Sequence, residues 1–289
     1  MWAVVINPIA GQGKGAIFGT QVTLFLHSRG IHYRIVSGTS AEHTARNLKQ
    51  FLSQEANCAG VIAVGGDGLV HLVLQQLAHT KIPLAVIPAG TGNDLCRTLG
   101  WPLDDIESIL ERVVKTAPRE IDLGLVDGEW FASILSTGFD SIVNERANTY
   151  KWPNGPSKYN RAILRELPLF KPRYYEIEMD GRKFSTKAML IAIGNGISYG
   201  GGMKVCPNAL VHDGLFDLMI LRPISKFEFL RVFPKVYAGT HISHPAVKIY
   251  KTKHVRISSD AVAYADGERV GPLPIEAECV PSALRTWIQ

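Results

Sequence analysis

The sequence lacks the features of several large protein classes. No stretch approaches the roughly 18 uninterrupted apolar residues of a membrane-spanning helix. The four cysteines are widely scattered, with no pair at metal-ligand spacing, so we expect reduced thiols rather than disulfides or a zinc site. No basic segment with a cleavage site precedes the first apolar run, which favours a cytoplasmic protein over a secreted one.

Motifs for acyl transfer and for a Walker-type phosphate loop are missing as well. There is no Gly-x-Ser-x-Gly turn and no Cys/His arrangement for a nucleophile. The turn from Gly11 to Gly15 is not a Walker loop, because Gly15 follows Lys14 and the glycine spacing differs. Taken alone, this turn predicts only a flexible connection between a strand and a helix.

The composition is that of a globular protein with a basic balance. Hydrophobic residues make up 46% and charged residues 20% of the 289 residues, and the net charge is +5. A positive charge favours an anionic partner, which can be a nucleotide, an acidic lipid surface or nucleic acid. Between Lys226 and Arg256 there are seven Lys or Arg residues and a single acid, Glu228. A solvated basic face is the plainer interpretation of that run by itself.

The chain divides into two parts by its hydrophobic pattern. Up to about residue 120, strand and helix patterns alternate, which indicates a parallel sheet covered by helices on both faces. The predicted strands are 3–6, 31–36, 61–64 and 84–87. The segment Thr39-Ser40-Ala41-Glu42 has the form of a capping box and predicts a helix that begins there.

Beyond Pro118, segments of period two dominate, with helical insertions near 141–150 and 157–167. The turns Asp180-Gly181, Asp213-Gly214 and Asp266-Gly267 predict antiparallel hairpins. We therefore expect an α/β domain over residues 1–120 and a mainly β domain over residues 121–289.

Two glycine-rich turns follow strands of the first domain. Gly65-Gly66-Asp67-Gly68 comes between a buried strand and an amphipathic helix, where backbone N–H groups can approach a phosphate and Asp67 can hold Mg²⁺. Alternatively, Asp67 only caps the helix. Gly90-Thr91-Gly92-Asn93-Asp94 follows the next strand. Helix caps explain each turn separately but not the richness of both in glycine, so nucleotide phosphate binding at this sheet edge is the better hypothesis.

These motifs, in this order, resemble the diacylglycerol kinase catalytic-domain family, in its soluble bacterial lipid-kinase branch. The resemblance covers nearly the whole chain and is most specific in the C-terminal half. Its motifs are Asn7-Pro8 with the following glycines, Gly65 to Gly68, Pro88 to Asp94 with Arg97, Ile121 to Gly124, Gly194 to Gly196, Gly200 to Met203, Ala209 to Asp217, and Asp266-Gly267-Glu268.

The resemblance implies a three-layer α/β nucleotide-binding domain followed by a β-sandwich, with the active site in the cleft between them. It implies an ATP site formed by Thr39, Gly65, Gly66, Asp67, Gly68, Gly90, Thr91, Gly92 and Asn93. Asp67, Asp94 and Asp122 would belong to a Mg²⁺-linked acidic network. Asp213 and the carbonyls of Leu210 and Leu215 would hold a structural Mg²⁺, a sensible set of oxygen ligands.

The implied reaction is ATP-dependent phosphorylation of diacylglycerol, with Glu268 as the general base. The pattern around Glu268 alone indicates only an acid in an exposed turn. The resemblance also implies transient docking on the anionic inner face of the membrane, and no nucleic-acid partner. A homodimer is compatible with the sequence, which does not determine the oligomeric state. The segment Lys158–Phe170 places three apolar residues beside Lys158, Arg161 and Arg165, as in an interfacial helix or in one packed on the sandwich.

Other functions stay open. Another kinase activity is one alternative: the acceptor could be a sphingoid base, or NAD, since the first two glycine motifs are shared in part with NAD kinases and phosphofructokinases. A regulator that binds lipid or nucleotide without turnover is the alternative from another class. The changes at Leu69 and His71 favour it, in the segment Leu69-Val70-His71-Leu72 where the family usually has Thr, a hydrophobic residue, Asn and Glu. The intact Asp94, Asp213 and Glu268 speak against it.

Overall fold

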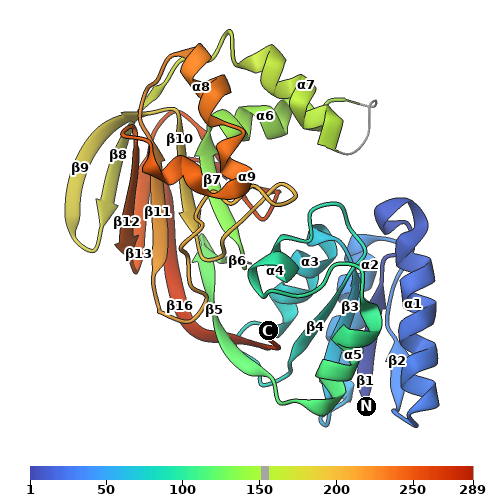
Figure 1. Ribbon diagram of the computed structural model, residues 1–289. Coiled ribbons are helices and arrows are strands. Elements are labelled where there is room, and N and C mark those ends of the chain that lie inside the picture. Colours follow the sequence, from blue (N-terminus) through green and yellow to red (C-terminus); the bar gives the residue numbers. More distant parts are fainter. Residues whose placement is uncertain (151–155, 289) are drawn as a thin grey trace. The chain divides into compact units, whose positions relative to one another are not determined.

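The structure, a computed structural model, describes residues 1–150 and 156–288, apart from the side chains of residues 148 and 156–160. The chain forms two compact units (Figure 1). Unit 1 comprises Met1–Leu123 with Pro281–Gln289, and unit 2 comprises Gly124–Val280.

Unit 1 is built on a parallel sheet. Its strands lie in the order β2 (Tyr33–Ile35), β1 (Trp2–Ile6), β3 (Gly60–Gly65) and β4 (Leu84–Pro88). Every residue of β3 and β4 is buried, as expected for strands that are covered on both faces and therefore apolar throughout. The three-layer arrangement predicted from the alternating pattern is confirmed.

The helices of unit 1 cover both faces of this sheet (Figure 1). Helices α1 (Ala10–Ser28) and α5 (Ile106–Lys115) pack together, and so do α2 (Ala41–Gln54) and α3 (Asp67–Leu77). The short α4 (Asp94–Thr98) follows β4.

The cap of α2 differs from the prediction by one residue. Ser40 is the N-cap, and its hydroxyl accepts a hydrogen bond from the His43 amide at 3.2 Å. The predicted capping box began at Thr39 instead. Ser and Thr are both common N-cap residues, and the backbone, extended at Ser40, shows which of them caps this helix.

The end of the chain returns to unit 1. The predicted division into residues 1–120 and 121–289 assigned this end to the second domain instead. Strand β5 (Arg119–Val126) leads out of unit 1, and the long β16 (Ile275–Thr286) leads back. Thr286 pairs with Leu84 of β4, and its hydroxyl donates to the Leu84 carbonyl at 2.7 Å. The ring of Trp287 stacks on Trp2 with centroids 6.2 Å apart. The end of the final strand therefore pairs with β4 at the edge of the sheet of unit 1.

Unit 2 is a β-sandwich. One sheet has six antiparallel strands in the order β12 (Val247–Thr252), β11 (Phe216–Leu221), β10 (Leu190–Gly194), β7 (Ile134–Gly138), β14 (Val262–Ala265) and β15 (Glu268–Pro272). The other contains β13 (His254–Ser258), β8 (Arg173–Met179) and β9 (Arg182–Ala188) beside β16, with β5 and β6 (Glu129–Phe131) at its edge. A buried apolar cluster that includes Tyr175, Phe216 and Ile257 fills the space between them. The predicted β-sandwich is confirmed.

Two Asp-Gly pairs form the tight hairpin turns that the pattern predicts. Asp180 and Gly181 join β8 to β9, and both have positive φ angles, 47° and 79°. Asp266 and Gly267 join β14 to β15 in the same way, with φ angles of 50° and 91°. Two positive φ angles match the twist of a two-residue hairpin. The hairpin predicted at Asp213-Gly214 is wrong, because this pair lies in the long connection from β10 to β11.

Helices cover the outer face of the six-stranded sheet. They are α6 (Phe139–Asn148), α7 (Pro156–Glu166), α8 (Lys226–Val232) and α9 (Lys235–Ala238), followed by a 3₁₀ turn at Thr240–Ser243. Ile163 and Leu167 are buried in the apolar cluster beneath them, whereas Leu164 is 67% exposed. Of the two interpretations of this segment, packing on the sandwich is therefore the one observed for its apolar face. The side chain of Lys158 lies outside the described residues.

Within residues 1–150 and 156–288, no helix is both long enough and apolar enough to cross a bilayer.

Candidate active site

The glycine-rich turns that follow β1, β3 and β4 lie against one another. A Cβ atom on Gly90 would stand 2.4 Å from the Cα of Gly66, and one on Gly11 would stand 2.1 Å from the carbonyl oxygen of Ala89. Only glycine permits such close approach of backbone to backbone. The turn at Gly11, taken from the sequence as a mere connection, therefore belongs to the same sheet edge as the other two.

Helix α3 begins at this edge without a side-chain cap. Its N-cap is Gly66, so the alternative that Asp67 caps its own helix is wrong. The first-turn N–H groups of a helix have no intrahelical partner and carry a partial positive charge. Gly66 and Gly68 place no side chain over them. This arrangement suits a phosphate group.

Asp67 instead links α3 to the next turn. Its carboxylate accepts a hydrogen bond from the Asn93 amide at 2.9 Å and one from the Asp94 amide at 2.8 Å. Burial raises the pKa of Asp67, and the two backbone hydrogen bonds act in the opposite direction. The carboxylate thus satisfies the donors at the start of α4, across the sheet edge from its own helix.

Asn93 closes the turn after β4. Its φ angle is 53°, in the left-handed region that asparagine tolerates. The side-chain oxygen accepts from the Gly90 amide and the side-chain nitrogen donates to the Gly90 carbonyl, each at 2.9 Å. Arg97 Nε donates to the Gly92 carbonyl at 2.9 Å. Thr91, at the tip of this turn, is exposed.

Two predicted carboxylates come together at Gly92. A Cβ atom on Gly92 would stand 2.3 Å from Asp67 Oδ2 and 3.1 Å from Asp94 Oδ2. Both oxygens therefore face the same glycine. Carboxylate oxygens are the ligands that Mg²⁺ prefers, and Mg²⁺ in kinases is held by one or two of them together with phosphate oxygens. Asp67 and Asp94 fit that role.

Asp122 and Thr39 have other described contacts. The buried Asp122 accepts a hydrogen bond from the Ser282 amide at 3.0 Å. The hydroxyl of Thr39 lies 3.2 Å from His43 Nδ1, in the turn before α2. Among the side chains that the structure describes, no three of the His, Cys, Asp and Glu type gather as a metal site. Asp122 therefore does not complete a three-carboxylate group with Asp67 and Asp94.

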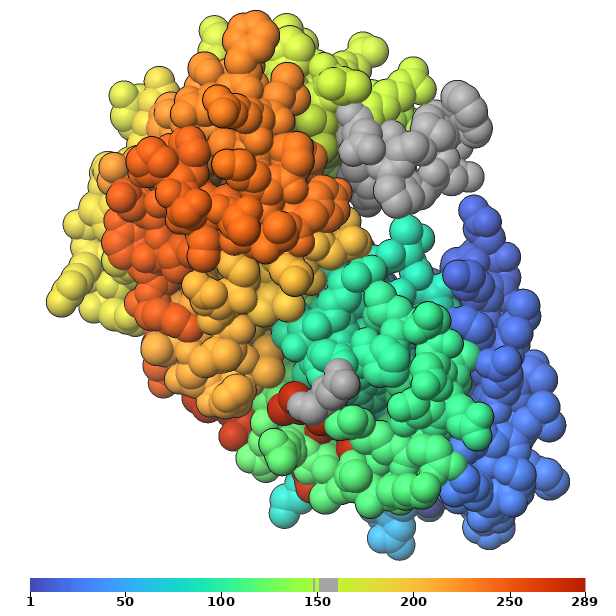
Figure 2. Space-filling model, in the orientation of Figure 1, coloured from blue at the N-terminus to red at the C-terminus, as the bar shows by residue number. Residues whose placement is uncertain are grey.

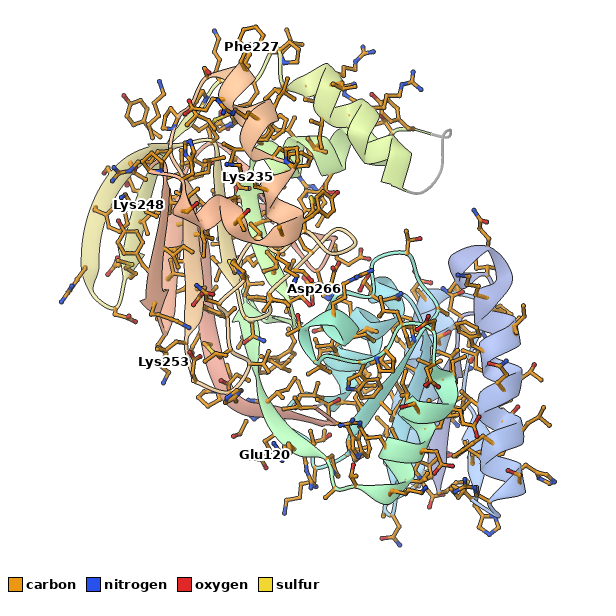
Figure 3. All side chains as sticks on the ribbon, viewed as in Figure 1. Glu120, Phe227, Lys235, Lys248, Lys253 and Asp266 are labelled. Carbon is orange, nitrogen blue, oxygen red and sulfur yellow. The ribbon has the colours of Figure 1, made fainter. Side chains whose placement is uncertain are left out.

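In unit 2, Glu268 is exposed at the first position of β15, opposite Ala265. The turn before it is held by Asp266, labelled in Figure 3. The Asp266 carboxylate accepts hydrogen bonds from the amides of Ala132, Ser133 and Ile134 at 2.7, 2.8 and 3.1 Å. Sequence reasoning singled out Glu268 and missed this role, because the amides that Asp266 binds are more than 130 residues away.

The expected structural metal site contains a lysine. Lys251 Nζ lies 2.8 Å from Asp213 Oδ2 and 2.7 Å from Asp217 Oδ1, and Asp213 Oδ1 accepts from the Leu215 amide at 3.1 Å. The Asp217 side chain is only 1% exposed. The two carboxylates hold the pKa of Lys251 above its usual value although burial lowers it.

Asp213 is thus paired with a lysine ammonium. Leu210, a predicted carbonyl ligand, has a side chain that is 48% exposed. An ammonium group against the carboxylate repels a dication, so the residues as arranged do not fit the implied structural Mg²⁺.

The departures after Gly68 have local structural consequences. Leu69 packs on Gly65: a Cβ atom added to Gly65 would stand 2.7 Å from Leu69 Cδ2. His71 is buried, with its Nε2 3.4 Å from Gln75 Nε2 one turn later in α3. Leu69 thus contacts the end of β3, whereas the contact between His71 and Gln75 lies within α3.

A further buried carboxylate, Asp140, lies in the first turn of α6 in unit 2. Its burial raises its pKa to about 6. It is not among the predicted site residues.

Comparisons with known proteins agree with this arrangement. Residues 1–126 match the diacylglycerol kinase catalytic domain, and residues 133–288 match the YegS C-terminal NAD kinase beta sandwich-like domain. A curated diacylglycerol kinase of Mycobacterium tuberculosis (strain H37Rv, ATCC 25618) is 37% identical over 286 residues, with 96% of this chain and 92% of that protein covered. A diacylglycerol kinase of Bacillus subtilis (strain 168) is 31% identical, with 94% and 91% covered.

Solved structures show the same fold. Two structures from Bacillus anthracis str. Sterne, one of them named a diacylglycerol kinase, cover the whole of this chain with TM-scores of 0.82 and 0.76. Their sequence identity is 22% and 20%, and 95% and 96% of those chains are covered. The chain belongs to the diacylglycerol kinase catalytic-domain family, as its motifs predicted. It is accordingly a kinase of the lipid-kinase type.

Proposed function

We propose that the protein transfers the γ-phosphoryl group of ATP to the free hydroxyl of diacylglycerol, giving phosphatidic acid and ADP. The observation that carries the proposal is the convergence of the glycine turns with Asp67 and Asp94 at one sheet edge. The names of the relatives support the choice of acceptor.

Unit 1 would bind the nucleotide. The N–H groups of the turns Gly65–Gly68 and Gly90–Asn93, together with the uncapped start of α3, would bind the phosphates. Asp67 and Asp94 would hold Mg²⁺, which supplies charge neutralisation at the phosphate oxygens when bound. The hydrogen bonds of Asp67 and Asn93 keep both turns in place before the nucleotide arrives, so little reorganisation is needed on binding.

Glu268 of unit 2 would act as the general base. Its carboxylate would take the proton of the lipid hydroxyl while that oxygen forms a bond to the γ-phosphorus. The bond from the γ-phosphorus to the bridging oxygen breaks at the same time, and its electron pair leaves with ADP. The hydrogen bonds of Asp266 would set the position of Glu268 at the start of β15.

The acceptor reaches the site from a membrane, because the acyl chains of natural diacylglycerol stay in the bilayer. The protein would therefore act at the cytoplasmic face of the membrane as a peripheral enzyme. Its net charge of +5 would favour anionic lipid there.

The test is an assay with γ-labelled ATP and Mg²⁺ against diacylglycerol, a sphingoid base and NAD, with product identification. We expect labelled phosphatidic acid, and no label with an Asp94→Asn variant. Label on the sphingoid base or on NAD alone would replace the proposed acceptor. If no acceptor is labelled while ATP still binds, the protein is a regulator of the kinase fold, and the substituted Leu69 and His71 become the first positions to revert.

A further inference from the structure

Unit 2 carries large apolar side chains that are open to solvent at one corner. Phe227, at the start of α8, is 87% exposed and projects away from the sheets (Figure 3). Leu169, in the connection from α7 to β8, is 75% exposed. The two positions are neighbours, because Lys226 Nζ donates a hydrogen bond to the Pro168 carbonyl. Figure 2 shows the atoms of α8 and α9, in orange, at the surface of unit 2.

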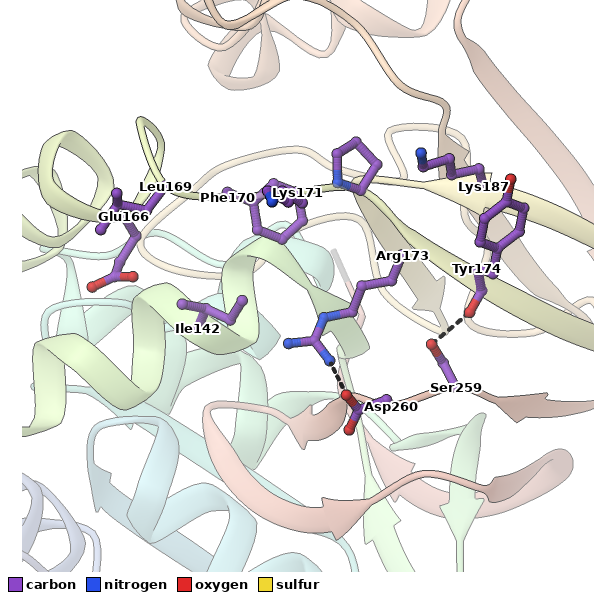
Figure 4. Close-up of a pocket in the computed structure, with 11 residues that line it drawn as sticks. Ile142, Glu166, Leu169, Phe170, Lys171, Arg173, Tyr174, Lys187, Ser259 and Asp260 are labelled. Atoms are coloured by element: carbon purple, nitrogen blue, oxygen red, sulfur yellow. Dashed lines mark hydrogen bonds and ion pairs between the residues drawn. The ribbon is translucent and has the colours of Figure 1, made fainter.

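A hollow with cationic groups adjoins this corner (Figure 4). Its volume is about 590 Å³, and Ile142, Leu169 and Phe170 provide apolar lining. Lys171, Arg173 and Lys187 line it as well.

The positive charges outnumber the free negative ones in this hollow. Glu166 is paired with Arg146 at 2.5 Å. Arg173 lies 3.4 Å from Asp260, whose side chain is fully exposed, so this pairing is weak. Among the described side chains, no carboxylate forms an ion pair with Lys171 or Lys187. Lys187 instead lies over the Tyr174 ring, with Nζ 5.4 Å from its centroid.

Apolar tips flanked by cations match the chemistry of an anionic lipid surface. Exposed Phe and Leu side chains enter the boundary between headgroups and acyl chains, while Lys and Arg meet lipid phosphates. A stable protein partner would instead need roughly 800 Å² of continuous complementary surface on each side, whereas here a cationic hollow interrupts the apolar area.

We propose that unit 2 docks on bilayers that contain anionic phospholipid through this corner, with Phe227 and Leu169 inserted and Lys171 and Lys187 at lipid phosphates. The hollow then receives a single lipid headgroup with the upper part of its acyl chains. This inference rests on the proposed function, since a membrane-held acceptor requires such a surface. The proposed docking surface is not the apolar face of α7, where Ile163 and Leu167 are buried. It includes the connection that follows α7.

Vesicle binding measures the contribution of each kind of contact. The charge attraction of each Lys near an anionic surface corresponds to about a fivefold change in binding, and partial burial of a Phe to about a tenfold change. Vesicles of phosphatidylcholine with phosphatidylglycerol should therefore bind Phe227→Ser about tenfold less than the wild type. A Lys171→Gln, Lys187→Gln double variant should bind roughly 25-fold less. Added salt should weaken the binding of the wild type more than that of the lysine variant.

Matched controls are available elsewhere on the surface. Leu24, on α1, is 63% exposed, and Lys248, on β12, is exposed as well. Leu24→Ser changes an exposed leucine of unit 1, and Lys248→Gln changes an exposed lysine on another strand of unit 2. Both should bind vesicles like the wild type, and equal losses in the controls would overturn the proposed location.

A short-chain, water-dispersible diacylglycerol separates docking from catalysis. Phe227→Ser and the lysine double variant should phosphorylate it at the wild-type rate, yet lose activity on diacylglycerol in vesicles in step with binding. If these variants bind vesicles normally while the wild type is active, the docking surface is wrong and the proposed function stands. If the wild type binds vesicles through these residues but phosphorylates neither form, the proposed function fails and the docking surface stands. A wild type that binds no vesicle overturns the docking proposal.

Discussion

Replacing Asp67 by Asn removes one of the two carboxylate oxygens that accept hydrogen bonds from the start of α4. The carboxylate offers one oxygen to the Asn93 amide and the other to the Asp94 amide. An Asn side chain has a single oxygen, so one of these amides would face an NH₂ group instead of an acceptor. A buried donor left without a partner costs about 1–3 kcal/mol.

About 2 kcal/mol corresponds to a shift of roughly 4–8 °C in a domain of 150–250 residues. We expect Asp67→Asn to lower the melting temperature by the lower part of that range, roughly 4 °C, because Asn also removes a buried charge. If Asp67 only lined a surface cleft, its replacement would leave the melting temperature nearly unchanged. Turnover should be lost at the same time, because the variant removes a proposed Mg²⁺ ligand and loosens the turn at Gly90. Differential scanning calorimetry and the labelled-ATP assay measure the two effects.

Asp104→Asn is the control, an exposed aspartate of the same unit. It should leave both the melting temperature and the activity unchanged. An Asp67→Asn protein that melts with the wild type would show that the carboxylate does not hold the turn in solution. One that keeps most of its activity would remove Asp67 from the nucleotide site.

Three other changes test separate parts of the structure. Glu268→Gln should lower kcat by roughly 10²–10⁴ at unchanged ATP affinity; near-normal phosphorylation would exclude it as the base. Asp213→Ala should lower the melting temperature because Lys251 loses a partner, and a chelator should leave that of the wild type unchanged; a fall on chelation would show that a metal binds there after all. Because burial raises the pKa of Asp140 from 3.8 to about 6, the stability from its protonated form is complete below pH 3.8 and is lost as the pH rises through about 6. Asp140→Asn should therefore stabilise the protein by roughly 3 kcal/mol at a pH above about 6 and change its stability little at about pH 4. Thermal melts of both proteins at the two pH values measure this, and equal melting curves at the higher pH would contradict the burial of a charged carboxylate.

Features encoded by neighbouring residues could be predicted from the sequence. Continuous apolar runs identified β3 and β4, because a strand covered on both faces must be apolar throughout. The pairs Asp180-Gly181 and Asp266-Gly267 identified two hairpins, because few other residues adopt two successive positive φ angles. The same pattern misled at Asp213-Gly214, since a left-handed glycine also serves an irregular loop.

The order of the motifs along the chain was enough to identify the family, and with it the kind of reaction. It did not determine the partners of the site residues. Asp67 was expected beside phosphate, but its bonds to Asn93 and Asp94 span 26 and 27 residues. Nothing in the basic run around Lys251 indicated that this lysine pairs with Asp213, 38 residues away.

By itself, then, the sequence determined local conformations: the buried strands of unit 1, the hairpin turns at Asp180-Gly181 and Asp266-Gly267, and the glycine turns that follow β3 and β4. Only the tertiary structure decided that the turns meet at Gly66 and Gly90, that Lys251 faces Asp213, and that Thr286 returns to Leu84 across 202 residues. The physical reason is that backbone preference and hydrophobic period are set by residues close along the chain. Contacts between distant residues depend instead on how all the elements pack together, which no local pattern specifies.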